Sequence, residues 1–189
     1  MPDHIADVAC ISLPAELAER LRVAYGLDKT PATLGEVVAG RQTNGRVPCP
    51  EDLYSNELTR HAVQSGSETR YTYCIMDALM LPVLTGQTLA VRSQAPTGET
   101  VTLLVRPDAI EASAPGAVVS YGLARADGGD VHSTVCPYIN IFPSQEAYER
   151  WAAAVADDAV TMALPLEAAA AFARHIARGG VHESSRSCC

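Results

Sequence analysis

A cysteine and an aspartate stand three residues apart in the segment Cys74-Ile75-Met76-Asp77. On a helix, residues at this spacing share one face, with Cβ atoms about 5–6 Å apart, so the two groups could act on one substrate. The surrounding stretch YTYCIMDALMLPVL, residues 71–84, is apolar apart from Asp77. Burial without a compensating partner raises the pKa of a carboxyl group, which makes Asp77 a candidate proton donor near neutral pH. The alternative is a structural cysteine beside an aspartate that caps a turn or meets an arginine.

A second candidate thiol, Cys136, begins an apolar stretch that runs over residues 137–142. A side chain at the edge of such a stretch is held near the core, so Cys136 could meet Cys74. The sequence has no histidine cluster and no Cys-x-x-Cys pair beside these two cysteines. Two thiols alone favour a soft metal with two ligands over tetrahedral zinc, which takes four nitrogen or sulfur ligands.

The composition restricts the class of protein that can use these groups. The chain has 189 residues, of which 48% are hydrophobic and 19% charged, typical of one globular domain with at most a small appendage. Its net charge of -8 and pI near 5.0 argue against binding to nucleic acid or anionic lipid. No apolar stretch reaches the roughly 20 residues of a membrane-spanning helix, and no leader is visible, so we expect a cytoplasmic protein. There its six cysteines would stay reduced, which favours reactive or metal-binding roles.

The elements that must position these groups follow from hydrophobic periodicity and from proline and glycine positions. Short helices are predicted over 13–22 and 33–39, closed by Gly26 and Gly40. A buried helix is predicted over 71–84, kinked or stopped by Pro82. Strands are predicted over 88–93, 100–106, 117–122 and 138–142, followed by helices over 144–156 and 165–178. The fold class is therefore α+β, a mostly antiparallel sheet flanked by helices, with a short helical N-terminal region.

We expect four parts along the chain. These are a helical N-terminal region over 1–45, a connecting segment over 46–70 with at most one or two helical turns, a core domain over 71–178, and a flexible tail over 179–189. The tail ends in the vicinal pair Cys188-Cys189, and Cys49 lies between two prolines. These three thiols are candidates for passing a metal to or from the pocket. The alternative for the pair is an incidental tail.

The stretch from Tyr71 to Ala177 resembles the organomercurial (alkylmercury) lyases. The likeness rests on the order and spacing of the two cysteines and the aspartate within a longer pattern, which comprises Tyr73, Cys74, Asp77, Leu79, Pro82, Gly86, Val91, Ser93, Thr97-Gly98, Val101, Leu103, Pro107, Ile110, Pro115-Gly116, Asp130-Val131, Cys136, Phe142, Ser144, Trp151 and Arg174-His175. Two departures stand out: the N-terminal region is shorter than the winged-helix-like module of the family, and Pro137 occupies a position where the family often has a cysteine.

The resemblance implies a reaction in which Cys74 attacks the mercury of R-Hg-X and Cys136 supplies the second sulfur. Asp77 would relay the thiol proton to carbon as the C–Hg bond breaks. Hg(II) would remain between Cys74, Cys136 and Asp77 as the product, with no organic cofactor, and would leave to small thiols or to a mercuric reductase. Two alternatives stay open: a non-catalytic thiol protein that binds or senses Hg(II) or Cu(I), and a family relative acting on a non-mercurial substrate in a biosynthetic pathway.

Overall fold

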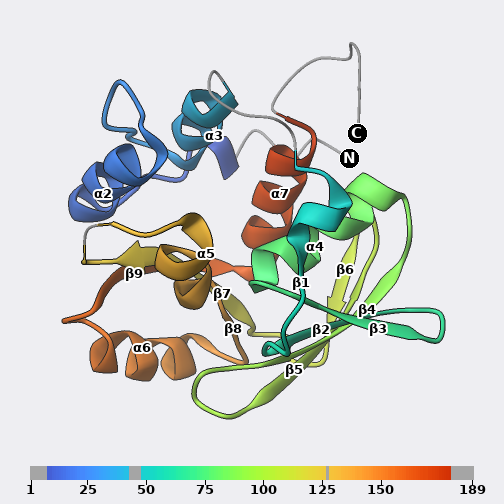
Figure 1. The fold of residues 1–189 in the computed structure, drawn as a ribbon. Coiled ribbons are helices and arrows are strands. Elements are labelled where there is room, and N and C mark those ends of the chain that lie inside the picture. The colour runs from blue at the N-terminus through green and yellow to red at the C-terminus, as the bar shows by residue number, and fades with distance from the viewer. Residues whose placement is uncertain (1–7, 43–47, 127, 180–189) are drawn as a thin grey trace.

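The computed structural model describes residues 8–42, 48–126 and 128–179 and contains helices and two antiparallel β-sheets (Figure 1). The predicted α+β class is confirmed, although the strands divide into a six-stranded and a three-stranded sheet rather than one. No helix in these three ranges is long and apolar enough to cross a membrane.

Two short helices, α2 (Ala15–Tyr25) and α3 (Leu34–Gln42), form the N-terminal region. As predicted, α2 ends at Gly26, whose φ of 61° is the left-handed conformation that glycine adopts without strain. The prediction that Gly40 ends the next helix is wrong, because α3 continues to Gln42. Gly40 instead permits close packing, since a Cβ there would lie 2.9 Å from Leu27 Cδ2.

The larger sheet has the strand order β1-β3-β2-β4-β5-β6, with every pair antiparallel. Its strands are β1 (Tyr54–Ser55), β2 (His61–Ser65), β3 (Glu68–Thr72), β4 (Leu89–Gln94), β5 (Thr100–Val105) and β6 (Ile110–Ala112). The predicted strands over 88–93 and 100–106 are confirmed as β4 and β5. The short β6 was not predicted.

The prediction that 46–70 only connects is wrong for its second half. A single 3₁₀ turn, η1 (Pro50–Leu53), is followed by the hairpin β2–β3, which pairs with β4 and so extends the sheet. Gly66, with φ 59°, lies in the tight turn of this hairpin. The sequence pattern did not reveal these strands, because the residues of β2 next to the turn, Gln64 and Ser65, are polar and exposed. Only His61 and Val63 of β2 are buried.

Helix α4 (Ile75–Thr85) carries the apolar stretch that the sequence placed at the centre of the core, and its residues from Ile75 to Pro82 are all buried. The helix begins later than predicted, because residues 71–72 complete β3. Pro82 does not stop it; the helix continues to Thr85 and ends at Gly86, with φ 71°. In Figure 1, α4 lies beside α7 (Leu166–Ala177), and the two helices pack together.

The smaller sheet has the order β8-β7-β9, formed by β8 (Ile141–Phe142), β7 (Val118–Ala124) and β9 (Ala159–Pro165). Helix α7 and helix α6 (Gln145–Ala154) pack on it from two sides, so β7 is buried along almost its whole length (Figure 1). Ser144 caps α6, as predicted, while β9 was missed. The predicted strand over 138–142 shrinks to β8, because the chain before it forms α5 (Val131–Thr134) and a 3₁₀ turn, η2 (Cys136–Tyr138).

Candidate active site

Cys74 occupies the N-cap position of α4, and Asp77 stands in its first turn. One carboxylate oxygen, Asp77 Oδ2, accepts hydrogen bonds from the backbone N–H of Cys74, at 3.1 Å, and from its Sγ–H, at 3.3 Å. This is the N-terminal capping geometry that an acceptor three residues into a helix favours. The predicted juxtaposition of thiol and carboxyl group is therefore present, and the helix start holds it.

Cys136 joins this pair from η2, although more than sixty residues separate it from Cys74 in sequence. The sulfurs of Cys74 and Cys136 and a carboxylate oxygen of Asp77 all lie within 4.8 Å of one another. All three residues are buried, with exposed fractions of 2% for Cys74, 7% for Cys136 and 8% for Asp77. In the three described ranges, this is the group of at least three such side chains whose geometry could hold a metal ion.

Burial sets the protonation of the centre. It raises the pKa of Asp77 to about 6, although the hydrogen bonds from Cys74 and the positive charges of His132 and Arg41 act in the opposite direction. The predicted rise is confirmed. Burial also raises the pKa of the Cys74 thiol well above its usual range, with the contact to Cys136 and the charge of Asp77 acting the same way. At neutral pH the resting state is thus mainly a thiol donating to a carboxylate.

An imidazole completes one side of the centre. His132 Nδ1 lies 3.8 Å from Cys136 Sγ, and the imidazole ring stacks on Tyr73 with 3.9 Å between ring centroids. Sequence reasoning missed this contact, since the histidines show no ligand-like spacing. The signal was nevertheless present: His132 stands four residues before Cys136, a spacing that places two side chains on one face of a helical turn.

Two further hydrogen bonds fix the backbone around the trio, and these too were missed. Thr72 Oγ1 donates to the carbonyl of Cys74 at 2.9 Å, and the N–H of Ile75 donates to the carbonyl of Ile139 at 3.4 Å. The second bond joins the start of α4 to the turn that carries Cys136. The bond between Ile75 and Ile139 joins segments far apart in the sequence, so no local pattern reveals it.

Of the other predicted thiols, the structure describes only Cys49, and it is not part of the centre. Cys49 is half-buried at the start of η1, where its N–H donates to Asp52 Oδ2 at 3.2 Å. It does not belong to the group formed by Cys74, Asp77 and Cys136. Cys188 and Cys189 lie outside the described residues. None of the four described cysteines forms a disulfide with another.

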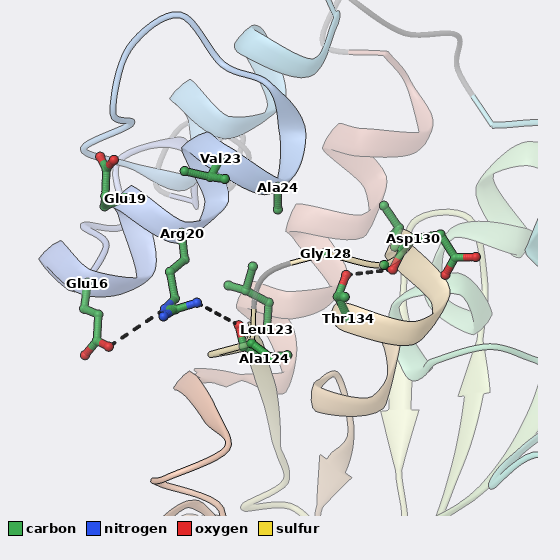
Figure 2. A pocket seen from close by; sticks show the side chains of 13 residues that line it. Glu16, Glu19, Arg20, Val23, Ala24, Leu123, Ala124, Gly128, Asp130 and Thr134 are labelled. Atoms are coloured by element: carbon green, nitrogen blue, oxygen red, sulfur yellow. Dashed lines mark hydrogen bonds and ion pairs between the residues drawn. The ribbon is translucent and has the colours of Figure 1, made fainter.

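An open cavity of about 700 Å³ lies elsewhere, between α2, the end of β7 and α5. Figure 2 shows Arg20 of α2 reaching Glu16 and the carbonyl of Ala124, and Thr134 bonded to the backbone of Asp130. Neither Cys74 nor Cys136 lines this cavity. Helix α5 touches both places, because its Val131 and Thr134 line the cavity while its His132 contacts Cys136.

Fold and site together define an α+β protein with a buried centre of two thiols and one carboxyl group, suited to a soft metal. The sequence model of the MerB family, described as alkylmercury lyase, matches residues 54–178. The chain belongs to the alkylmercury lyase family. The match begins at β1, so it includes the strands that the sequence had assigned to a connecting segment.

Comparisons with individual proteins support the same family assignment. The chain is 30% identical to an alkylmercury lyase of Staphylococcus epidermidis over 136 residues, which cover 69% of this chain and 61% of the relative. It is also 30% identical to an alkylmercury lyase of Pseudomonas putida over 95 residues, which cover 50% of this chain and 45% of that relative. A crystal structure described as the mercury-bound form of MerB2 superposes with a TM-score of 0.56 at 20% identity, covering 68% of this chain and 62% of that one. The chain thus spans about half to three fifths of the length of these relatives.

Proposed function

We propose that this protein is an organomercurial lyase that cleaves the C–Hg bond of R-Hg-X by protonolysis. The observation that carries the proposal is the convergence of two sulfurs and a carboxylate oxygen within 4.8 Å. A linear S–Hg–S unit spans about twice a metal–sulfur bond of roughly 2.3 Å, or about 4.6 Å. One mercury atom therefore fits between Cys74 and Cys136 with Asp77 beside it.

In the proposed reaction the Sγ–H proton of Cys74 passes to Asp77 along the existing hydrogen bond. The Cys74 thiolate then attacks mercury and displaces X⁻, and Cys136 adds its sulfur while its proton leaves with X⁻ as HX. The protonated Asp77 delivers its proton to carbon as the C–Hg bond breaks. The products are R-H, HX and Hg(II) held by two sulfurs, so atoms and charge balance.

The environment of Asp77 supports this role. With a pKa of about 6, its carboxyl group can both accept a proton from a thiol and give it up near neutral pH. Soft thiolates stabilise soft mercury as the carbon leaves, and a placed acid avoids a free carbanion. The reaction needs no organic cofactor, because the two thiols and the acid supply every group that it uses.

Release of Hg(II) completes the proposal. Small thiols or a mercuric reductase would accept the metal by thiol exchange, since a thiolate ligand is displaced most readily by another thiolate. Cys188, Cys189 and Cys49 are candidates for carrying it outward. We also retain the predicted N-terminal region over 1–45, the predicted tail over 179–189 and the predicted cytoplasmic location, and we extend the core domain to begin at β1, which pairs with β3.

A second candidate is a non-catalytic binder of Hg(II) or Cu(I), which the near-complete burial of both thiols favours. A buried two-sulfur site retains a soft ion well. Such a protein would take up metal stoichiometrically and release no hydrocarbon. A family relative that acts on a non-mercurial substrate would also release no hydrocarbon from R-Hg-X.

The test is incubation of the reduced protein with phenylmercury and excess small thiol, with benzene measured by gas chromatography. We expect catalytic benzene from the wild type and none above background from Cys74→Ser, because a hydroxyl is too hard and too weakly acidic to replace a thiolate at mercury. Cys10→Ser is the matched control, since Cys10 is exposed and outside the centre, and it should retain full activity. Bound phenylmercury without benzene in the wild type would refute the lyase proposal.

A further inference from the structure

The turn that carries Cys136 is held by two buried polar side chains that take no part in the proposed reaction. Ser120 of β7 is 0% exposed, and Asn140, between η2 and β8, is 3% exposed. A buried polar group is costly unless its hydrogen bonds are made, and both residues make theirs to this turn.

Ser120 binds the turn through its side chain and its backbone. Its Oγ–H points to the carbonyl of Tyr138 at 2.8 Å, and the same oxygen accepts from the N–H of Asn140 at 2.9 Å. Its own N–H donates to the carbonyl of Asn140 at 2.8 Å. One residue of the central strand of the smaller sheet therefore fixes the turn at two positions, Tyr138 and Asn140.

Asn140 closes the turn from inside. Its side-chain Nδ2–H donates to the carbonyl of Pro137 at 2.7 Å. Within the turn, the N–H of Ile139 donates to the carbonyl of Cys136 at 3.2 Å. The backbone that bears the Cys136 thiol is thus restrained on both sides of Ile139.

Ile139 also contacts the other thiol-bearing segment. Its carbonyl accepts from the N–H of Ile75, the residue after Cys74, at 3.4 Å. The N–H of Ile139 therefore bonds the backbone of Cys136, and its carbonyl bonds the backbone at the start of α4. Whatever fixes Ile139 fixes the position of Cys136 relative to Cys74.

We propose that Ser120 and Asn140 are positioning residues that set the separation of the Cys74 and Cys136 sulfurs, and so the affinity of the site for two-coordinate Hg(II). This inference rests on the proposed function, in which both sulfurs bind one mercury atom. Because the span of S–Hg–S is fixed, a turn that holds Cys136 in place avoids the cost of ordering it when the metal binds.

The experiment is equilibrium binding of HgCl₂ to the reduced protein in competition with dithiothreitol, with the thiolate-to-mercury ultraviolet absorption as the spectroscopic readout. Ser120→Ala should lower the affinity about 10- to 100-fold, the range seen when support for metal ligands is removed. Ser93→Ala is the control: Ser93 is also 0% exposed, and its hydroxyl bonds the His61 ring 2.8 Å away rather than the turn of Cys136. The Hg(II) affinity of Ser93→Ala should stay within about twofold of wild type, although its thermal stability should fall about as much as that of Ser120→Ala.

Two further variants keep the test decisive. Asn140→Ala removes the side-chain bond to Pro137, an exposed residue, and leaves the Ser120 hydroxyl in place, so this variant carries the test where Ser120→Ala does not fold. Ser120→Thr keeps the hydroxyl and should restore most of the affinity. Wild-type affinity in Ser120→Ala or Asn140→Ala, or an equal loss in Ser93→Ala, would overturn the positioning role. Full affinity in Cys136→Ser would instead overturn the two-thiol proposal beneath it.

Discussion

The two thiol-bearing segments reach the same depth in the core by different means. Cys74 is held by neighbours in its own segment, above all Asp77 three residues away and Thr72 two residues before it. Cys136 is held by Ser120, a strand residue that bonds its turn from outside, and by Asn140, which closes the turn from inside. The first arrangement follows from local capping, whereas the second exists only once the smaller sheet has formed. The reactive pair therefore depends on tertiary structure at one of its two members.

The most severe way to challenge this comparison is to remove each thiol in turn. Cys74→Ser and Cys136→Ser should both reduce benzene release from phenylmercury to background, despite their different support, because in the proposed reaction each sulfur is one of the two ligands of the metal. Gas chromatography under excess small thiol measures the effect, with Cys10→Ser as the control. Turnover that survives in Cys136→Ser would mean that Cys74 and Asp77 suffice and that the second segment is only structural.

A change confined to the Cys74 segment should separate cleavage from metal binding. Asp77→Asn keeps an oxygen that can accept from the Cys74 N–H but cannot relay a proton. We expect benzene release to fall about 10²- to 10⁴-fold, the usual contribution of general acid–base catalysis, while one Hg(II) per chain is still bound. Rates are measured by gas chromatography and bound metal by mercury analysis after desalting. An unchanged rate would remove Asp77 from the mechanism.

The raised pKa of Asp77 also predicts a pH-dependent stability that belongs to this segment. Its pKa of about 6 in the folded protein exceeds the ordinary value of 3.8, so the native state binds the proton more tightly than the unfolded chain. The resulting stabilisation is complete below pH 3.8 and is lost as pH rises through 6, amounting to about 3 kcal/mol. In denaturant unfolding at several pH values, the free energy of unfolding of Asp77→Asn should rise by this amount relative to that of wild type between pH 3.8 and 7.

Cys136→Ser provides the control for that measurement, since it leaves Asp77 in place. Its free energy of unfolding relative to wild type should change little over the same pH range. A wild type and an Asp77→Asn variant with parallel pH profiles would show that Asp77 titrates normally, contrary to its burial.

The smallest expected effect on cleavage concerns the two cysteines that end the chain. Replacing both Cys188 and Cys189 by serine should leave benzene release unchanged and slow the transfer of Hg(II) to an external thiol acceptor, if the pair carries metal outward. Stopped-flow transfer to a chromogenic dithiol measures the second step. Transfer at the wild-type rate would assign the pair no role.

The sequence predicted the features that local chemistry determines. The spacing of Cys74 and Asp77, the cap at Ser144, the stop at Gly26 and the buried apolar helix before Gly86 all follow from the order of neighbouring residues. It failed where tertiary contacts override local pattern. The polar hairpin β2–β3 is a strand pair because β4 lies beside it.

The candidate site divides in the same way. The position of Cys136 at the edge of an apolar stretch made it a candidate, whereas its pairing with Cys74 came from the resemblance to a family and not from any periodicity. His132 could have been found from its spacing of four residues to Cys136, whereas Ser120 and Asn140 could not. Their role rests on hydrogen bonds between segments twenty residues apart, which leave no trace in either segment alone.

The most direct test of the account is a single turnover without added thiol. Reduced protein is mixed with one equivalent of phenylmercury, benzene is measured by gas chromatography, and the coordination of the retained mercury is measured by X-ray absorption. We predict one benzene per chain and Hg(II) bound by two sulfurs, with no benzene from Cys136→Ser. Benzene from Cys136→Ser at the wild-type yield, or product mercury bound by a single protein sulfur in the wild type, would contradict the claim that the two segments act on one metal atom.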